Sequence, residues 1–303
     1  MVILLGLAAA VLYGSGDFLG GMASRRAHVL TVLTLVETAG AIVALAVAAA
    51  SSGPVSLAGL AWGIAAGAIG ALGLIIFYAG LAAGPMSVVA PVSGLVSTVL
   101  PVAVALAEGE RPSLAVYAGA LLCLVAIVLA SSAGEGGEGG EAGEGGEAGE
   151  AGGTSGTSTA RRSGRPGHGI AYGVLAGLAF GLFFLLIRNA GQSGAVWPVA
   201  AARIGEVAAV LAAAAVLRRG VLPRGADGRL LLTAVGAGVI DVVANLCYVA
   251  ATRTGLFGLA VVLASLYPGV TVLLARVVLG ERLRWVQRTG LGLAAIGTLL
   301  VAI

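Results

Sequence analysis

The sequence contains no lysine, two cysteines, few aromatic residues (5%) and few charged residues (10%) among its 303 residues. Without lysine it cannot form a phosphate-binding loop of the Walker type, which argues against direct coupling to ATP. Cys123 and Cys247 stand alone, with no CxxC spacing, so neither a disulfide framework nor a metal site is expected. The scarcity of charge excludes an ordinary soluble domain, which carries about a quarter charged residues.

Apolar residues predominate in the sequence. They make up 59% of the chain, and the mean hydropathy is +1.05. This composition predicts a polytopic protein of a cell membrane, most simply a bacterial plasma membrane, with the lipid bilayer as its surroundings. The basic residues are all arginines at the ends of apolar runs and form no basic stripe, so no nucleic-acid partner is expected.

Ten apolar runs have the length of about 20 residues that a helix needs to cross a bilayer. In lipid the backbone must satisfy its own hydrogen bonds, so these runs predict an all-α bundle of ten transmembrane helices. Five runs precede a polar segment and five follow it. They cover residues 3–22, 28–50, 57–82, 87–107, 113–132, 169–188, 195–217, 230–252, 256–279 and 285–303.

The polar segment separates two halves, 1–132 and 169–303. From Gly134 to Gly152 glycine recurs at every third residue, and each of six glutamates follows a glycine. Proline is absent from this run, so a collagen-like strand is not expected. Repelling glutamates in a glycine-rich chain instead predict a disordered linker over 133–168 that transport does not need.

The two halves resemble each other at an offset of 167 to 171 residues. Because each half has an odd number of spans, the second copy of a shared fold must lie upside down, as in many secondary transporters. The substrate site of such proteins lies near the bilayer midplane. Matching residues include Glu37 with Glu206, Gly67 with Gly238, Gly109-Glu110-Arg111 with Gly280-Glu281-Arg282, and Gly119 with Gly290.

These Gly-Glu-Arg turns and the glycines after them are similar to the ten-helix EamA-type group of the drug/metabolite transporter superfamily. Ala200-Ala201-Ala202-Arg203 and the segment from Tyr13 to Phe18 add to the resemblance. It covers everything except the linker, and it implies export or import of small metabolites, often amino-acid-like or drug-like. We expect a monomer or homodimer without a cofactor. The chain departs from the family in its long linker and in Thr34, which stands where span two usually has an arginine.

The arginines divide unevenly between the two sides of the predicted bundle. Loops after spans one, five, seven and nine hold twelve of them, whereas the other loops hold only Arg111, Arg188 and Arg253. The positive-inside rule therefore predicts both termini outside the cytoplasm. The family resemblance implies the opposite orientation.

Ionisable residues within spans are costly and mark candidate sites, at about 2.5–3.5 kcal/mol each on insertion scales. The acids are Asp17, Glu37, Glu206 and Asp241, and Arg203 is the one deep base. Arg203 and Glu206 share a helix face, which fits either an internal ion pair or a site for substrate or protons. Glu37 could equally be a structural acid, and Asp17 could lie at the wet end of its span.

Span eight carries a polar stripe at positions i, i+4, i+7 and i+11, formed by Asp241, Asn245, Tyr248 and Thr252. Such a stripe favours the lining of a cavity over simple contact between helices. Pro91, Pro101 and Pro268 are expected to interrupt spans four and nine. Tyr267, beside the last of these prolines, is a candidate aromatic residue of the cavity.

If all four acids are ionised, Arg203 neutralises one and three negative charges remain. We therefore expect protons as the coupling ion or a substrate with a positive group, such as an amino acid or an amine. The candidate substrate-binding residues are Asp17, Glu37, Arg203, Glu206, Asp241, Asn245, Tyr248 and Tyr267.

Two other functions remain open at this point. Gly14-Ser15-Gly16-Asp17 matches the GxGD pattern of intramembrane aspartyl proteases, with Asp241 as a second acid. These proteases have a tyrosine before one catalytic aspartate and a Pro-Ala-Leu motif. Here Asp241 follows Ile240 and no Pro-Ala-Leu motif occurs, which argues against an enzyme. A passive channel or a structural bundle is the other alternative, although no carbonyl selectivity filter or ring of like charges is visible.

Overall fold

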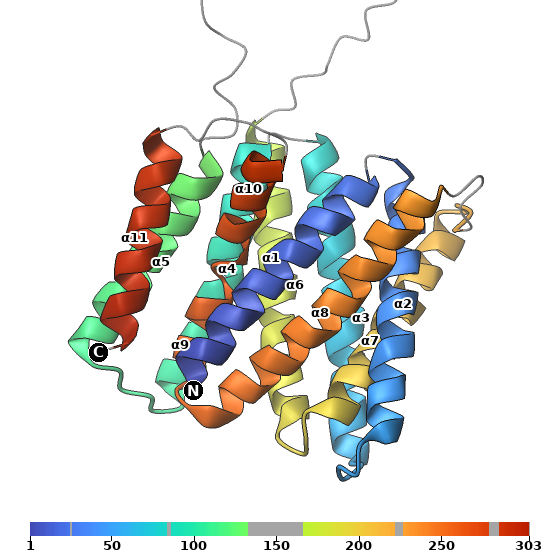
Figure 1. Cartoon of the computed structure of the whole chain (residues 1–303), viewed down its shortest axis with the longest axis horizontal. Coiled ribbons are helices and arrows are strands. Elements are labelled where there is room, and N and C mark those ends of the chain that lie inside the picture. Colours follow the sequence, from blue (N-terminus) through green and yellow to red (C-terminus); the bar gives the residue numbers. More distant parts are fainter. Residues whose placement is uncertain (25, 84–85, 133–165, 222–226, 279–284, 303) are drawn as a thin grey trace, which may run out of the picture.

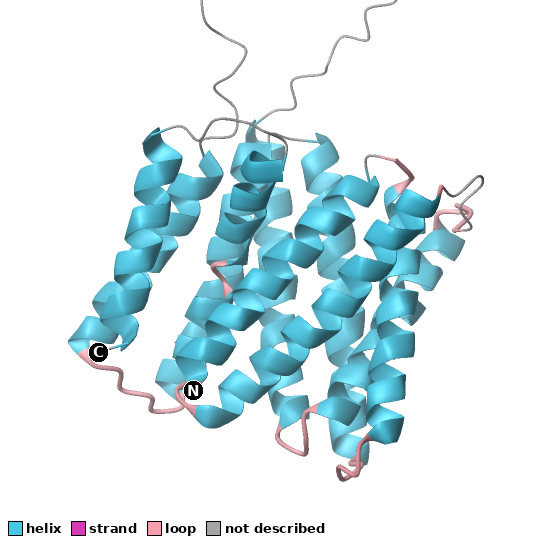
Figure 2. Ribbon diagram, in the orientation of Figure 1, coloured by secondary structure: helices cyan, strands magenta, loops and turns pink. Residues whose placement is uncertain are grey.

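The computed structural model describes residues 1–24, 26–83, 86–132, 166–221, 227–278 and 285–302. Helices dominate this part of the chain, and it contains no strand (Figure 2). The helices are α1 (Val2–Ser24), α2 (Val29–Ala50), α3 (Leu57–Ala83), α4 (Met86–Ala107), α5 (Leu114–Ser132), α6 (Pro166–Gly191), α7 (Val196–Val216), α8 (Gly228–Thr254), α9 (Phe257–Ala264), α10 (Tyr267–Val278) and α11 (Trp285–Ala302).

Each of the ten predicted runs coincides with helix, but the ninth is divided into α9 and α10. The described residues therefore form eleven helices rather than ten. Six of the described helical stretches are long and apolar enough to cross a membrane, namely Val2–Ser24, Val29–Ala50, Leu57–Phe77, Ile170–Gly191, Val196–Val216 and Gly228–Thr254. The chain is thus a multi-pass integral membrane protein. The predicted linker lies outside the described residues except for 166–168, which begin α6.

Proline interrupts span nine but not span four. The ring of Pro268 clashes with a helical carbonyl four residues earlier, and that residue, Ala264, is the last of α9. Helix α10 restarts at Tyr267, so Pro268 lies in its first turn, where no backbone donor is needed. The prediction for span four was wrong, because α4 continues through Pro91 and Pro101 while packed against α6.

The helices run between two faces of the molecule, and α9 and α10 each cover part of that distance (Figure 1). We call the face where α5 ends and α6 begins the linker face, and the face where α1 begins and α11 ends the terminal face. Arg26 and Arg229 lie at the linker face, whereas Arg188 and Arg253 lie at helix ends on the terminal face. The described arginines thus follow the predicted division, and the membrane orientation stays a prediction.

Helices of one half pack mainly on helices of the other. Helix α1 packs on α8, and α6 packs on α3. Helix α2 contacts α7 and α8, α3 also contacts α7, α4 contacts α6, and α1 also contacts α9 and α10. The pair α5 and α11 stands at one edge of the bundle, opposite α2 and α7 (Figure 1). Charges on α2, α7 and α8 are thereby brought to one place.

Glycines allow α3 and α7 to touch through their backbones. A Cβ atom on Gly63 or Gly67 would meet the carbonyl oxygen of Pro198 or Ala202, and one on Gly205 would meet the carbonyl of Ile64. Small residues four apart allow this close approach between membrane helices. The positions of the charged side chains on α7 depend on this contact.

Substitution of Gly67 with alanine is expected to destabilise the protein by about 1–3 kcal/mol, because the added methyl group overpacks a backbone contact. Thermal unfolding in detergent measures the loss. Gly21 of α1 has nothing within 4 Å of an added Cβ, so Gly21→Ala is the matched control. Equal unfolding temperatures for the two variants would contradict the proposed role of this contact.

Candidate functional site

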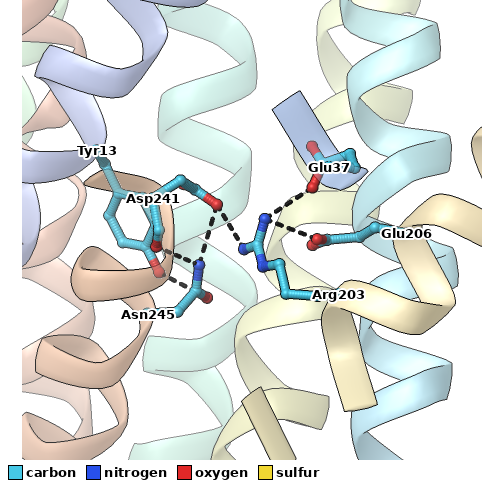
Figure 3. Close-up of polar contacts among 6 residues, drawn as sticks. All are labelled: Tyr13, Glu37, Arg203, Glu206, Asp241 and Asn245. Carbon is cyan, nitrogen blue, oxygen red and sulfur yellow. Dashed lines mark hydrogen bonds and ion pairs between the residues drawn. The ribbon is translucent and has the colours of Figure 1, made fainter. Parts of the chain in front are cut away.

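Arg203, on α7, lies at the centre of a cluster of carboxylates. Its Nη1 atom lies 2.7 Å from Oε2 of Glu37 on α2 and 2.8 Å from Oε2 of Glu206, one turn further along α7. Its Nη2 atom lies 2.5 Å from Oδ2 of Asp241 on α8. Figure 3 shows the guanidinium group between the two glutamates on one side and Asp241 on the other. We call these four residues the Arg203 cluster.

Asp241 is more exposed to solvent than the other three residues of the cluster. The side chains of Arg203, Glu37 and Glu206 are 2%, 4% and 5% exposed, whereas that of Asp241 is 27% exposed. The Oε2 atom of Glu206 is buried and ion-paired with Arg203, but no group in the described part of the chain donates a hydrogen bond to it. Removing charges from water is costly unless each is paired, so these groups must act together.

Asn245 links the cluster to α1. Its Nδ2 atom donates hydrogen bonds to the backbone carbonyl oxygen (2.9 Å) and to Oδ2 (3.2 Å) of Asp241, one turn earlier on α8. Its Oδ1 atom accepts a hydrogen bond of 3.0 Å from the hydroxyl of Tyr13 (Figure 3). The carboxylate of Asp241 is thereby held between the guanidinium and an amide.

Four aromatic rings, including that of Tyr13, lie beside this link. Tyr13 packs edge-on against Phe184 and Tyr267, with ring centroids 6.3 Å apart in each pair. Phe184 lies 4.8 Å from the ring of Tyr248, whose hydroxyl donates a hydrogen bond of 3.3 Å to the Phe184 carbonyl. Edge-to-face rings of this kind form a rigid apolar layer next to the carboxylates.

The structure brings together seven of the eight predicted site residues, directly or through Tyr13. Arg203, Glu37, Glu206 and Asp241 form the cluster, Asn245 adjoins it, and Tyr248 and Tyr267 belong to the aromatic layer. Asp17 is half-buried on α1 and makes no hydrogen bond or ion pair within the described part of the chain, although the neighbouring Gly16 faces Asp241.

The polar stripe on α8 is more tightly packed than predicted. Asn245, Tyr248 and Thr252 are at most 8% exposed, because α1 and α6 cover them, and only Asp241 is partly open. Sequence reasoning did not select Tyr13 or Phe184. Tyr13 could have been found, since it lies one turn before Asp17, but nothing distinguishes Phe184 from other apolar residues of its span.

Neither a metal nor a cofactor is suggested by this site. Among the described residues, no group of three histidine, cysteine, aspartate or glutamate side chains is arranged to hold a metal ion. The chemistry available is ion pairing, proton binding and contact with aromatic rings. Interactions of these kinds are strong in a low-dielectric interior and can hold a small charged molecule.

The sequence profile of the EamA-like transporter family matches residues 167–303, which include the whole of α7 to α11 and nearly all of α6. The second half of the chain is similar to the EamA-like transporter family. This match confirms the resemblance found in the Gly-Glu-Arg turns. EamA-like proteins are membrane transporters of the drug/metabolite superfamily, and this match supports a transporter.

The fold extends over both halves. A crystal structure described only as that of a protein has 19% sequence identity to this chain and a TM-score of 0.70, and the alignment covers 99% of this chain and 95% of the other. At this identity the similarity shows the fold alone. No curated protein sequence matches the chain.

Proposed function

We propose that this EamA-like protein is a secondary transporter that carries a small organic molecule with a positive group by alternating access. Its two halves act as inverted five-helix repeats with ten membrane spans, and the Arg203 cluster is the substrate site. The observation that carries this proposal is the meeting of Glu37, from the first half, with Arg203 and Asp241, from the second, inside apolar helices.

Charge balance supports a cationic substrate or a proton. With all groups ionised, the Arg203 cluster carries one positive and three negative charges, and burial makes this imbalance unfavourable. Asp241 is its most exposed carboxylate and lies beside Tyr13, whose ring contacts that of Tyr267. An ammonium group is attracted both to a carboxylate and to aromatic faces, so this corner fits an organic amine.

The glutamates are the natural place for a coupling proton. Glu37 and Glu206 both contact the same nitrogen of Arg203, so their carboxylates lie close to each other. Two buried carboxylates at such a short separation do not both ionise easily, so one of the pair is the group that we expect to take up a proton. A proton on the glutamate pair and an amine at Asp241 would compete, because both carboxylate sites interact with the same guanidinium group of Arg203.

The packing of the helices supports two inverted repeats. Exchange of each helix for its counterpart turns the contact of α1 with α8 into that of α6 with α3. The counterpart of α2 is α7, and the counterpart of α8 is α3, so the contact of α2 with α8 corresponds to the contact of α7 with α3. Helix α5 packs on α11, which is its own counterpart in the second half. The divided span formed by α9 and α10 also fits, because broken helices commonly line transporter sites.

No observation favours a protease or a passive channel. A proteolytic dyad requires two carboxylates that share one proton, whereas Asp241 is ion-paired with Arg203. The aromatic layer and the buried ion pairs close the middle of the bundle, which suits a carrier that alternates between states.

Purified protein in proteoliposomes tests the proposal. Uptake of a panel of radiolabelled amines, amino acids and matched neutral compounds should prefer cations and respond to an imposed pH gradient. Counterflow driven by unlabelled substrate should stimulate uptake, which distinguishes a carrier from a channel. Uptake that prefers no cation and ignores the pH gradient would contradict the proposal.

Replacement of residues 133–165 with a Gly/Ser linker of about 12 residues, with a root-mean-square span of roughly 20 Å, is expected to leave transport unchanged. The reason is that α5 ends and α6 begins on the same face, so a short connection suffices. Initial uptake rates normalised to inserted protein measure this. Loss of uptake by a stable, inserted variant would assign a role to the glutamate-rich segment.

A further inference from the structure

Glu110 closes the start of α9 from a distant part of the chain. Its carboxylate accepts hydrogen bonds from the backbone N–H groups of Phe257 (2.6 Å) and Gly258 (3.0 Å), the first two residues of α9. An acid at a helix N-terminus satisfies free donors and the positive end of the helix dipole. The turn after α4 is thus attached to the divided ninth span.

A second contact lies beside the first. Arg188, in the last turn of α6, forms two parallel contacts with the carboxylate of Glu108, at 2.9 Å and 2.7 Å. Its guanidinium also lies 4.1 Å from the ring centroid of Phe257, within the range of a cation–π contact. The hydrogen bond from Arg188 lowers the pKa of Glu108, so the pair remains charged at neutral pH.

These contacts lie between the candidate site and the terminal face. Phe184 and Arg188 are one turn apart on α6, and Tyr248 and Thr252 are one turn apart on α8. All eight residues of α9 are buried, and the break that ends α9 leads into Tyr267, which touches Tyr13. Any movement of α9 is therefore transmitted to the aromatic layer of the site.

The two faces of the bundle are not closed equally. On the terminal face, Phe257 is 1% exposed and Thr252 is 8% exposed although it lies in the last turn of α8. Along α8, Asp241 lies nearer the linker face than Thr252 does, and it is 27% exposed; Asp17 of α1 is half-buried. The described ion pair on the linker face, Arg26 with Asp227, has side chains that are 46% and 57% exposed, whereas Arg188 on the terminal face is 17% exposed.

We propose that Glu108, Glu110, Arg188 and Phe257 form a gate that closes the substrate site from the terminal face. This terminal gate rests on the proposed alternating access. Opening requires the turn after α4 to leave α9, which frees the two amides and separates Glu108 from Arg188. Glu108 is 47% exposed, and an ion pair at such a water boundary is weak enough to break in each cycle.

Thiol labelling tests the gate without any substrate. In a background with Cys123 and Cys247 changed to alanine, a single Thr252→Cys probe reports access to the layer behind the gate. Glu110→Ala and Arg188→Ala are each expected to raise the rate of labelling by a water-soluble maleimide at least about fivefold, because the closed state loses its attachments. Glu110→Gln, which keeps one acceptor, should give a smaller increase.

Asp227→Asn is the matched control, since it breaks an ion pair of the same type on the linker face and should leave labelling unchanged. Labelling that stays at the parental rate in both gate variants would overturn the proposal. An equal increase in the control variant would do the same, because it would show general loosening.

Cross-linking provides a second measurement in case a variant folds poorly. In the same background, Glu108→Cys with Arg188→Cys, joined by a short reducible bifunctional reagent, should abolish uptake, and reduction should restore it. Each single cysteine should be unaffected by the reagent. Full uptake by the cross-linked protein would overturn the gate. If the gate variants are labelled faster but the parent protein transports none of the tested compounds, the gate is supported and only the proposed function is contradicted.

Discussion

Replacement of Arg203 with methionine is expected to destabilise the protein by about 3–5 kcal/mol, because it leaves three carboxylates near one another without their cation. Transport should fall by about a hundredfold or more, since the site loses the group that orders Glu37, Glu206 and Asp241. Thermal unfolding and initial uptake rates measure the two effects. Arg203→Lys should recover little, because an ammonium group cannot reproduce the planar guanidinium between Glu37 and Asp241.

Two variants make this result specific. Arg26→Met breaks an ion pair whose side chains are about half exposed, and it should cost less than about 1 kcal/mol. Addition of Asp241→Asn to Arg203→Met should restore part of the lost stability by removing one uncompensated charge. If Arg203→Met unfolds like the parent protein, the carboxylates must already hold protons in place of the guanidinium.

Much of the fold follows from the sequence because lipid leaves the backbone few choices. A run of apolar residues such as 28–50 must satisfy its own hydrogen bonds, and it becomes α2 (Val29–Ala50) with almost the predicted bounds. Pro268 predicts an interruption, and its position four residues after Ala264 explains where α9 ends. Pro101 predicts the same for α4, yet tertiary packing against α6 prevails there.

The candidate site follows from the sequence only in part. The contact between Arg203 and Glu206 needs no more than their spacing on one helix face. Their meeting with Glu37, 166 residues away, depends on how α2 packs on α7, which hydropathy cannot reveal. Phe184 joins the site through its ring contacts, and Glu110 reaches α9 across 147 residues, so both became apparent only in the structure.

Asp241→Asn is expected to reduce uptake of a cationic substrate by about a hundredfold, because the asparagine cannot balance an ammonium charge in a low-dielectric site. Stability should change little, since Arg203 keeps Glu37 and Glu206 as partners. Initial rates over a range of substrate concentrations measure the effect. Asp227→Asn makes the same substitution next to the start of α8, where asparagine also caps a helix well, and it should transport normally.

The same variant separates the two roles that the cluster can give to Asp241. If Asp241 binds the amine, Asp241→Asn loses both uptake driven by a pH gradient and counterflow between equal pH values. If Asp241 instead binds the coupling proton, counterflow persists while the pH gradient no longer drives uptake. We expect the first result, because Asp241 is the exposed carboxylate beside the aromatic layer, whereas the buried Glu37 and Glu206 share one nitrogen of Arg203. Unchanged uptake in both assays would place the substrate elsewhere in the bundle.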